Sequence, residues 1–264
     1  TGRMKVLSEL VKTSLMLRGK TDEDLLNMPE VSDPKIRIAM SLIYKTMVFA
    51  YDRSEELMAI LGMKLLQLSV QYGNYKDSLA GYSTYAGILS IAFNNYKQAG
   101  RLNSVALKVA DKVADKPAHA MAYFGAGMTT YTPFRQSYLY FKKSFDTAVE
   151  GGAHTDAAPS TMYFYFLSFI QGKRLSEVHR ILLDNLYFTD QIKTENFHLI
   201  LLAGVNCVHE LKEGLETPAT GLRGKKLDAQ ELEEKIQNTE HRSIRIYARI
   251  FQMYNHMTFG HYDK

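Results

Sequence analysis

Tryptophan is absent from this sequence, proline occurs only six times in 264 residues, and there is a single cysteine. So few prolines, beside plentiful leucine, alanine, lysine, glutamate and methionine, favour helices over a strand-rich sandwich, which needs many closely spaced turns. The lone Cys207 leaves no partner for an intrachain disulfide and too few thiols for a cysteine metal cluster. We therefore predict an all-α protein of a reducing compartment, the cytoplasm.

An excess of one charge and a long apolar run are also missing. The 32 basic and 28 acidic residues are spread along the chain and give a net charge of +4, without the basic tail that would neutralise phosphates. The longest apolar stretches, 162–170 and 199–208, reach about half of the roughly 20 residues that a membrane-spanning helix needs. We expect neither a nucleic-acid partner nor insertion into a membrane.

Motifs that bind phosphate, zinc or a dinucleotide are missing as well. The glycine and lysine run at 221–226 lacks the glycine spacing and the hydroxyl residue of a phosphate-binding loop. His209 and Glu210 are not followed by the second histidine of a zinc-binding HExxH helix. The glycines at 125–127 follow no strand, so they are better explained by close helix packing than by a dinucleotide site. We predict no cofactor and no metal.

Groupings of ionisable or nucleophilic residues have simpler explanations than catalysis. Asp111 and Asp115 lie among lysines, and we interpret them as solvated side chains of an amphipathic helix. Cys207 and His209 are two residues apart, so on a helix their side chains diverge by about 200° and cannot form a nucleophile and base pair. We therefore predict no catalytic residues, and the segment is not expected to be an enzyme.

Apolar residues recur at intervals of three and four along most of the chain, which is typical of amphipathic helices. Helix starts are indicated where Asp33 precedes Pro34, where Thr132 precedes Pro133, and at Asp228, because such side chains accept hydrogen bonds from a first helical turn. Five glycines after periodic stretches are predicted to end helices in the left-handed conformation: Gly73, Gly151, Gly172, Gly214 and Gly260. The predicted helices cover residues 4–18, 34–52, 55–72, 77–95, 98–114, 117–131, 134–150, 157–171, 174–189, 194–213, 228–238 and 243–259.

Two kinds of helix alternate along the chain. Five of them are apolar on more than one side and need two covering layers, namely 77–95, 117–131, 157–171, 194–213 and 243–259. Three others carry a single apolar stripe, namely 98–114, 134–150 and 174–189. The midpoints of the doubly apolar helices recur about every 40 residues, which is the period of stacked helix pairs. The last doubly apolar helix has Ile244, Ala248 and Phe251 on one face and Ile250 and Met253 on another, and the sequence stops before a further helix would cover it.

The turn at 94–99 is similar to the helix-to-helix turn of tetratricopeptide repeats, where an aromatic residue and an alanine allow close crossing. We therefore predict a tetratricopeptide-like fold: a right-handed α-solenoid of antiparallel helix pairs. It is expected to form a single helical-repeat domain over 1–264, as a fragment of a larger protein. Its predicted parts are N-terminal helices at 1–54, helix-pair repeats at 55–214, a longer loop at 215–227 and a truncated last repeat at 228–264.

Six stretches, in order along almost the whole chain, resemble the helical-repeat region of large bacterial and fungal signalling proteins. Those proteins join a protein-kinase-like domain, an AAA/STAND-type ATPase, this region, and then sensor and histidine-kinase or cyclase domains. The stretches are 21–26, 32–34, 64–69, 72–74, 79–87 and 258–262. The family usually follows the glycine and asparagine at 73 and 74 with serine and proline, whereas 75–78 is Tyr-Lys-Asp-Ser here. The resemblance implies a scaffold that connects an ATPase switch to an output domain in a two-component type of signalling protein, with no catalytic residue of its own.

Three groups of side chains are candidates for binding a partner. Arg242, Arg245 and Arg249 form a basic edge that could bind an acidic peptide or a phosphate. The simpler explanation is that this edge is solvated, or is covered by a following helix. A polar edge of the apolar 194–213 helix carries His198, Asn206 and His209, with solvation as the simpler explanation. Aromatic residues of the doubly apolar helices either anchor a peptide in a groove or belong to the core: Tyr82, Tyr85 and Tyr123.

The expected function is therefore non-catalytic: binding of a protein or peptide, or of neighbouring domains of the same chain, for signal transmission. A small-molecule sensor with an aromatic-lined cavity between helices is the alternative.

Overall fold

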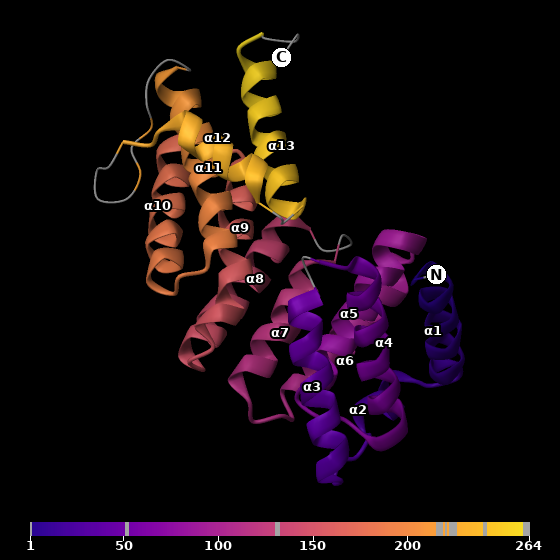
Figure 1. Ribbon diagram of the computed structural model, residues 1–264. Coiled ribbons are helices and arrows are strands. Elements are labelled where there is room, and N and C mark those ends of the chain that lie inside the picture. The colour runs from indigo at the N-terminus through magenta and orange to yellow at the C-terminus, as the bar shows by residue number, and fades with distance from the viewer. Residues whose placement is uncertain are drawn as a thin grey trace. The chain divides into compact units, whose positions relative to one another are not determined.

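The computed structural model describes residues 2–50, 53–129, 133–214, 219, 221, 226–239 and 242–260. Within these residues the chain forms helices and no strand, which confirms the all-α prediction (Figure 1). The helices are α1 (Gly2–Leu17), α2 (Asp22–Leu26), α3 (Pro34–Ala50), α4 (Glu55–Tyr72), α5 (Ser78–Phe93), α6 (Tyr96–Ala110), α7 (Lys116–Gly127), α8 (Phe134–Glu150), α9 (His154–Ile170), α10 (Leu175–Gln191), α11 (Glu195–Glu213), α12 (Ala229–Asn238) and α13 (Arg242–Thr258).

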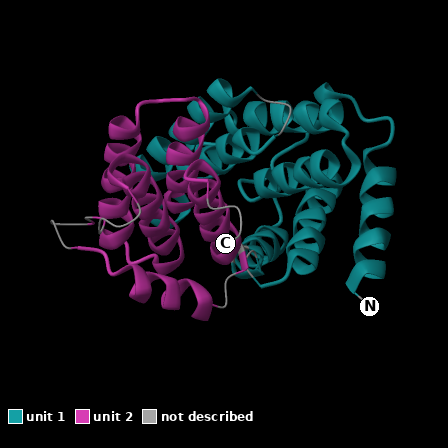
Figure 2. Ribbon diagram, turned by 90° about the horizontal axis from the view of Figure 1, so that it is seen from above, with its two compact units in different colours: residues 1–156 teal, residues 157–264 magenta. Residues whose placement is uncertain are grey.

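The chain divides into two compact units, which Figure 2 shows in different colours. Unit 1 comprises residues 1–156 and unit 2 comprises residues 157–264. The division falls inside α9 and not at a linker. Each unit has a hydrophobic core of its own.

Local capping chemistry explains several helix starts. Asp33 accepts a hydrogen bond from the Lys35 amide at 2.8 Å, and Asp228 accepts bonds from the first turn of α12, as predicted. Thr132 lies outside the described residues. Helix α2 was not predicted, because five residues are too few to show a period. It is held by a capping box, in which the Thr21 hydroxyl accepts from the Asp24 amide and the Asp24 carboxylate accepts from the Thr21 amide.

Positive φ angles, which favour glycine, occur at four of the five predicted glycines: Gly73, Gly172, Gly214 and Gly260. Gly73 and Gly214 are nevertheless not left-handed helical caps, because their ψ angles are 176° and 162°. Gly151 was the wrong choice, since its φ is −83° and Gly152 takes the left-handed conformation at φ 72°.

The link between α5 and α6 consists only of Asn94 and Asn95. Asn94 ends α5 in the left-handed conformation at φ 51°, and the Asn95 side chain accepts a hydrogen bond from the Gln98 amide at 3.2 Å. The turn at 94–99 is therefore a C-cap followed at once by an N-cap.

Helix α5 lies at the centre of unit 1, where it packs against α4, α6 and α7. Tyr82 is fully buried on it, and its hydroxyl donates to the Asn74 side chain at 3.1 Å. Gly81 permits the close approach to α4, since a Cβ atom there would lie 2.6 Å from the Leu66 amide nitrogen. Helix α3 covers another face of α4 through Met40 and Met47. Because α4, α6 and α7 all pack against α5, more than one of its apolar faces is covered, as its sequence pattern predicts.

Helix α11 has the corresponding central place in unit 2 and packs against α10, α12 and α13. Helix α9 adds Tyr165 to the same core, with its ring centroid 5.2 Å from that of Phe251 on α13. Cys207 is buried in this core, and its thiol donates to Asn255 at 3.0 Å. Burial raises the pKa of the Cys207 thiol to about 12, which keeps it protonated and unreactive.

Candidate functional site

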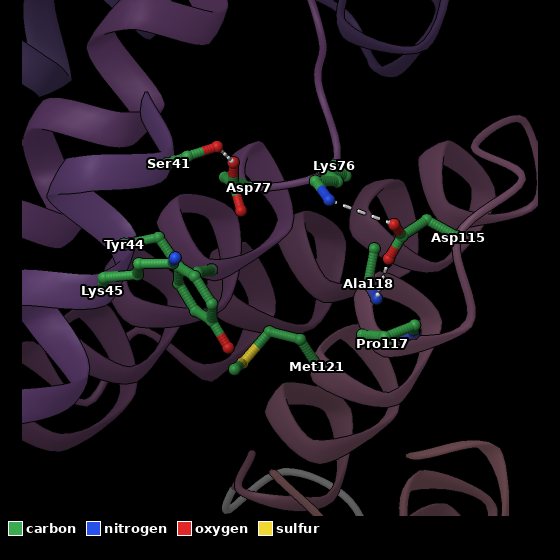
Figure 3. A pocket seen from close by; sticks show the side chains of 10 residues that line it. Ser41, Tyr44, Lys45, Lys76, Asp77, Asp115, Pro117, Ala118 and Met121 are labelled. Atoms are coloured by element: carbon green, nitrogen blue, oxygen red, sulfur yellow. Dashed lines mark hydrogen bonds and ion pairs between the residues drawn. The ribbon is translucent and has the colours of Figure 1, made fainter. Parts of the chain in front are cut away.

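Unit 1 contains a pocket of about 160 Å³ between α3, the segment that precedes α5, and the start of α7 (Figure 3). Its polar lining comes from Ser41 and Lys45 of α3, from Lys76 and Asp77, and from Asp115. Its apolar lining comes from Tyr44, Ala80, Pro117, Ala118 and Met121. Among the described residues, Tyr44 is the one aromatic side chain in its lining, so the described lining is not the aromatic-lined cavity of the sensor alternative.

Asp77 is the most buried charged group of this pocket, with 9% of its surface exposed. It stands directly before α5, yet its side chain forms no capping hydrogen bond with that helix. Instead, one carboxylate oxygen accepts a hydrogen bond from the Ser41 hydroxyl at 2.6 Å. The other oxygen points into the space enclosed by the labelled residues (Figure 3). Burial raises the pKa of the Asp77 carboxyl, and the Ser41 hydrogen bond and Lys76 oppose that rise.

Asp115 lies on the opposite wall and does two structural tasks. Its carboxylate accepts a hydrogen bond from the Ala118 amide at 2.9 Å, which caps α7, and it forms an ion pair with Lys76 at 3.3 Å. Our interpretation of Asp115 as a solvated carboxylate was therefore wrong, because it treated the residue as part of a helix face and missed the cap. Asp111 is exposed, as expected.

Tyr44 forms part of the floor of the pocket, and its environment favours the neutral phenol. Burial raises the pKa of its hydroxyl, and the nearby carboxylates of Asp156, Asp77 and Asp115 raise it further. Burial also raises the pKa of Asp156. Several carboxylates thus surround one phenol in a poorly solvated region of unit 1.

Sequence reasoning missed this pocket. Ser41, Asp77 and Asp115 are separated by more than thirty residues each, and no helical period connects them. One signal was present: the Tyr-Lys-Asp-Ser stretch at 75–78 supplies two of the charged lining residues.

The three candidate tyrosines of unit 1 do not share a groove. Tyr82 and Tyr85 are both buried in the core around α5, which removes them from the candidates for binding a partner. The physical reason is that α4, α6 and α7 pack against α5, and the Tyr85 hydroxyl also interacts with Ser14 of α1. Tyr123 is half-buried on α7, where Lys143 lies over its ring at 5.4 Å and Tyr140 stacks on it at 6.4 Å.

The polar edge of α11 is half-buried and engaged in local contacts. His198 shares a hydrogen bond with the Thr189 hydroxyl at 3.2 Å, and burial lowers its pKa. The Asn206 side chain donates to Glu210 at 2.6 Å. The Nε2 atom of His209 is buried and has no hydrogen-bond partner among the described residues. The structure therefore places these three residues along one helix without joining them into a site.

The basic edge of α13 is exposed, but two of its arginines make contacts within unit 2. Arg249 forms a two-pronged ion pair with Glu233 of α12, at 2.5 and 3.1 Å. Its hydrogen bonds hold the pKa of the Glu233 carboxyl down at about 2. Arg245 donates to the Thr239 backbone carbonyl at 2.6 Å. These contacts fix the direction of the guanidinium groups and leave donors available to a partner, since each has five.

An exposed apolar stripe runs along α13 on the side opposite its core face. The core face consists of Ile244, Ala248 and Phe251, all at most 5% exposed. The stripe consists of residues spaced by four, three and four, which are between 40% and 57% exposed: Ile246, Ile250, Met253 and Met257. The predicted second apolar face of this helix is therefore open among the described residues.

No three histidine, cysteine, aspartate or glutamate side chains of the described residues gather as metal ligands would. None of the described helices has the length and apolar content needed to cross a membrane.

No protein-family model, curated protein or solved structure matches this chain. Its function is therefore inferred from its own side chains and packing, together with the sequence resemblance described above.

Proposed function

We propose that this chain is a non-catalytic helical-repeat scaffold that binds a protein or peptide. In this proposal it forms a right-handed, tetratricopeptide-like α-solenoid of antiparallel helix pairs within a larger cytoplasmic signalling protein with ATPase and kinase or cyclase domains. The contacts of α5 with α4, α6 and α7, and those of α11 with α10, α12 and α13, support a layered arrangement inside each unit.

The observation that carries this proposal is the apolar stripe of α13 beside its arginine edge. Exposed apolar residues in such a regular row are uncommon on a surface that only faces water. The stripe spans three helical turns, from Ile246 to Met257, and the spacing matches that of anchors in helix-to-helix recognition.

Charge determines which partner fits this surface. Residues 242–258 contain three arginines and no acidic residue, and all three arginines are exposed. A partner that covers the stripe must therefore place its flanking residues against positive charge. We propose an amphipathic helix with an apolar face and flanking aspartate or glutamate residues.

A displayed library of amphipathic helical peptides tests this proposal. The library has apolar residues at positions spaced by four, three and four, and its flanking positions are randomised. We expect peptides selected on the wild-type protein to be enriched in acidic flanking residues, and to lose about tenfold or more in affinity for the double variant Ile250→Ser with Met253→Ser.

The matched control is Ile91→Ser, which removes an apolar side chain of α5 in unit 1 that is more exposed, at 70%, than Ile250 at 40% or Met253 at 57%. We expect this variant to bind the selected peptides like the wild type. Selected peptides without acidic enrichment, or peptides that bind the double variant as well as the wild type, would contradict the proposal.

A further inference from the structure

The charge of Asp77 is incompletely compensated by the described part of the chain. Its carboxylate has one hydrogen bond, from Ser41, and no basic side chain of a described residue lies within ion-pair distance. Lys76, its neighbour in sequence, is turned to Asp115 on the opposite wall (Figure 3). A carboxylate that is nine-tenths buried and lacks an ion-pair partner favours the approach of a cation.

The other charged groups of the pocket do not remove this preference. Lys76 and Asp115 neutralise each other at 3.3 Å. Lys45 also lines the pocket; it is exposed, and its charge opposes the rise in the Asp77 pKa, but no ion pair joins the two side chains. Asp156 lies near Tyr44 and adds negative charge on that side. Asp77 is therefore the buried charge of the pocket without an ion pair, and Lys45 is the cation with which a bound ammonium group would compete.

The size and walls of the pocket limit the ligand to a short carbon chain. A volume of about 160 Å³ is close to that of a dry cavity of about 150 Å³ that holds one benzene molecule. Ala80, Pro117, Ala118 and Met121 provide apolar walls that suit methylene groups. The Tyr44 ring provides an aromatic surface, against which a cation is also stabilised.

We propose that this pocket binds a primary ammonium group on a chain of about four carbons, with the Asp77 carboxylate as its counter-ion. A small alkylamine and the side chain of a lysine from another protein share this chemistry. The ammonium group lies between Asp77 and Tyr44, and the methylene groups lie against Ala118 and Met121. A neutral ligand of the same shape binds less tightly, because it leaves the carboxylate unpaired. This binding site is separate from the α13 surface, so it stands or falls independently of the function proposed above.

Titration with n-butylamine, with 1-butanol as the neutral analogue of equal length, tests the proposal. The readout is the change in the methyl NMR signals of Ala80 and Ala118, which line the pocket. We expect n-butylamine to bind about tenfold or more tightly than 1-butanol. Equal affinity for the two compounds, or no change of these signals with the amine, would overturn the proposal.

Variants identify the counter-ion. Asp77→Asn keeps the shape of the side chain and an oxygen for the Ser41 hydroxyl, and we expect it to reduce the affinity for n-butylamine to that for 1-butanol. Asp111→Asn removes an exposed carboxylate outside the pocket and should bind n-butylamine like the wild type. Unchanged binding by Asp77→Asn would refute the role of Asp77.

Lys45→Met keeps the proposal testable if Asp77→Asn does not fold. Lys45 is the ammonium group that competes for the Asp77 carboxylate, so its removal should tighten n-butylamine binding by a few-fold. Weaker binding by this variant would count against Asp77 as the counter-ion.

A further titration distinguishes the two sources of the ammonium group. Nα-acetyl-lysine N-methylamide carries the same four-carbon chain on a peptide backbone. Tighter binding of this compound than of n-butylamine assigns the pocket to a lysine of a partner protein, and weaker binding assigns it to a free amine. If neither compound binds, the proposal is wrong.

Discussion

Helices α5 and α13 have the same kind of sequence but different surroundings. Both are apolar on two faces, and the pattern alone predicts that both need two covering layers. Helix α5 is covered by α4, α6 and α7, and its largest side chain, Tyr82, is fully buried. Helix α13 contacts α11 and α12, and its second apolar face, with Ile250 and Met253, stays exposed.

The comparison shows that a helix with two apolar faces needs two covering layers. Its sequence does not show whether those layers come from the same chain or from a partner. In α5 the cover comes from the same chain, so its second face stabilises the fold. In α13 no described residue covers the second face, so its side chains add little to the fold and are available for an interaction. Substitutions on the two helices should therefore act on different properties.

The largest expected effect comes from truncation of Tyr82. Tyr82→Ala removes a fully buried aromatic ring and the hydrogen bond to Asn74, so we expect unit 1 to lose about 3–5 kcal/mol of unfolding free energy. Met253→Ala on α13 should change the stability of unit 2 by less than about 0.5 kcal/mol. Urea denaturation followed by circular dichroism measures both. Similar losses in the two variants would show that α13 is as fully packed as α5.

A pair of glycines within α5 sharpens the comparison further. Gly81→Ala places a methyl group 2.6 Å from the Leu66 backbone nitrogen and should cost about 2–3 kcal/mol. Gly87→Ala meets no atom within 4 Å and should stabilise the helix by about 0.5–1 kcal/mol. Thermal unfolding of the two variants tests the prediction, and it fails if both shift the midpoint in the same direction.

A smaller effect is expected where α13 meets α12, at the Arg249 and Glu233 ion pair. The pKa of Glu233 falls from 4.5 to about 2 in the folded protein, so its contribution is complete above pH 4.5 and is lost as the pH falls toward 2. Because both side chains are partly exposed, we expect this contribution to be about 1 kcal/mol or less.

The measurement compares the urea midpoints of the wild type and Glu233→Gln at pH 7 and at pH 2.5. The variant should be less stable at pH 7, and the difference should shrink at pH 2.5. A difference that does not depend on pH would mean that the carboxylate charge is unimportant at this contact.

Features decided by nearby residues were predictable from the sequence. The caps at Asp33 and Asp228 depend on bonds to residues two or three positions away, and the pattern for them is visible in the chain. The positive φ of Gly152, in place of Gly151, shows the limit of such local patterns, since two adjacent glycines satisfy them equally.

Features decided by tertiary packing were not predictable. Nothing in the sequence distinguishes the buried Tyr82 from the half-buried Tyr123, because both lie on helices with two apolar faces. The pocket depends on where Ser41, Asp77 and Asp115 meet, and these residues come from three separate segments. These residues meet because their helices pack together, and the spacing of residues along the sequence does not predict which helices pack.

The turn at Asn94 and Asn95 has a consequence for the order of folding. Among the described helices, no other consecutive pair is joined by so few residues. Because the entropy lost on closing a loop increases with its length, α5 and α6 meet at a lower entropic cost than helices joined by longer segments. Apolar side chains of both helices also belong to one core cluster, so we expect this hairpin to form early when unit 1 folds.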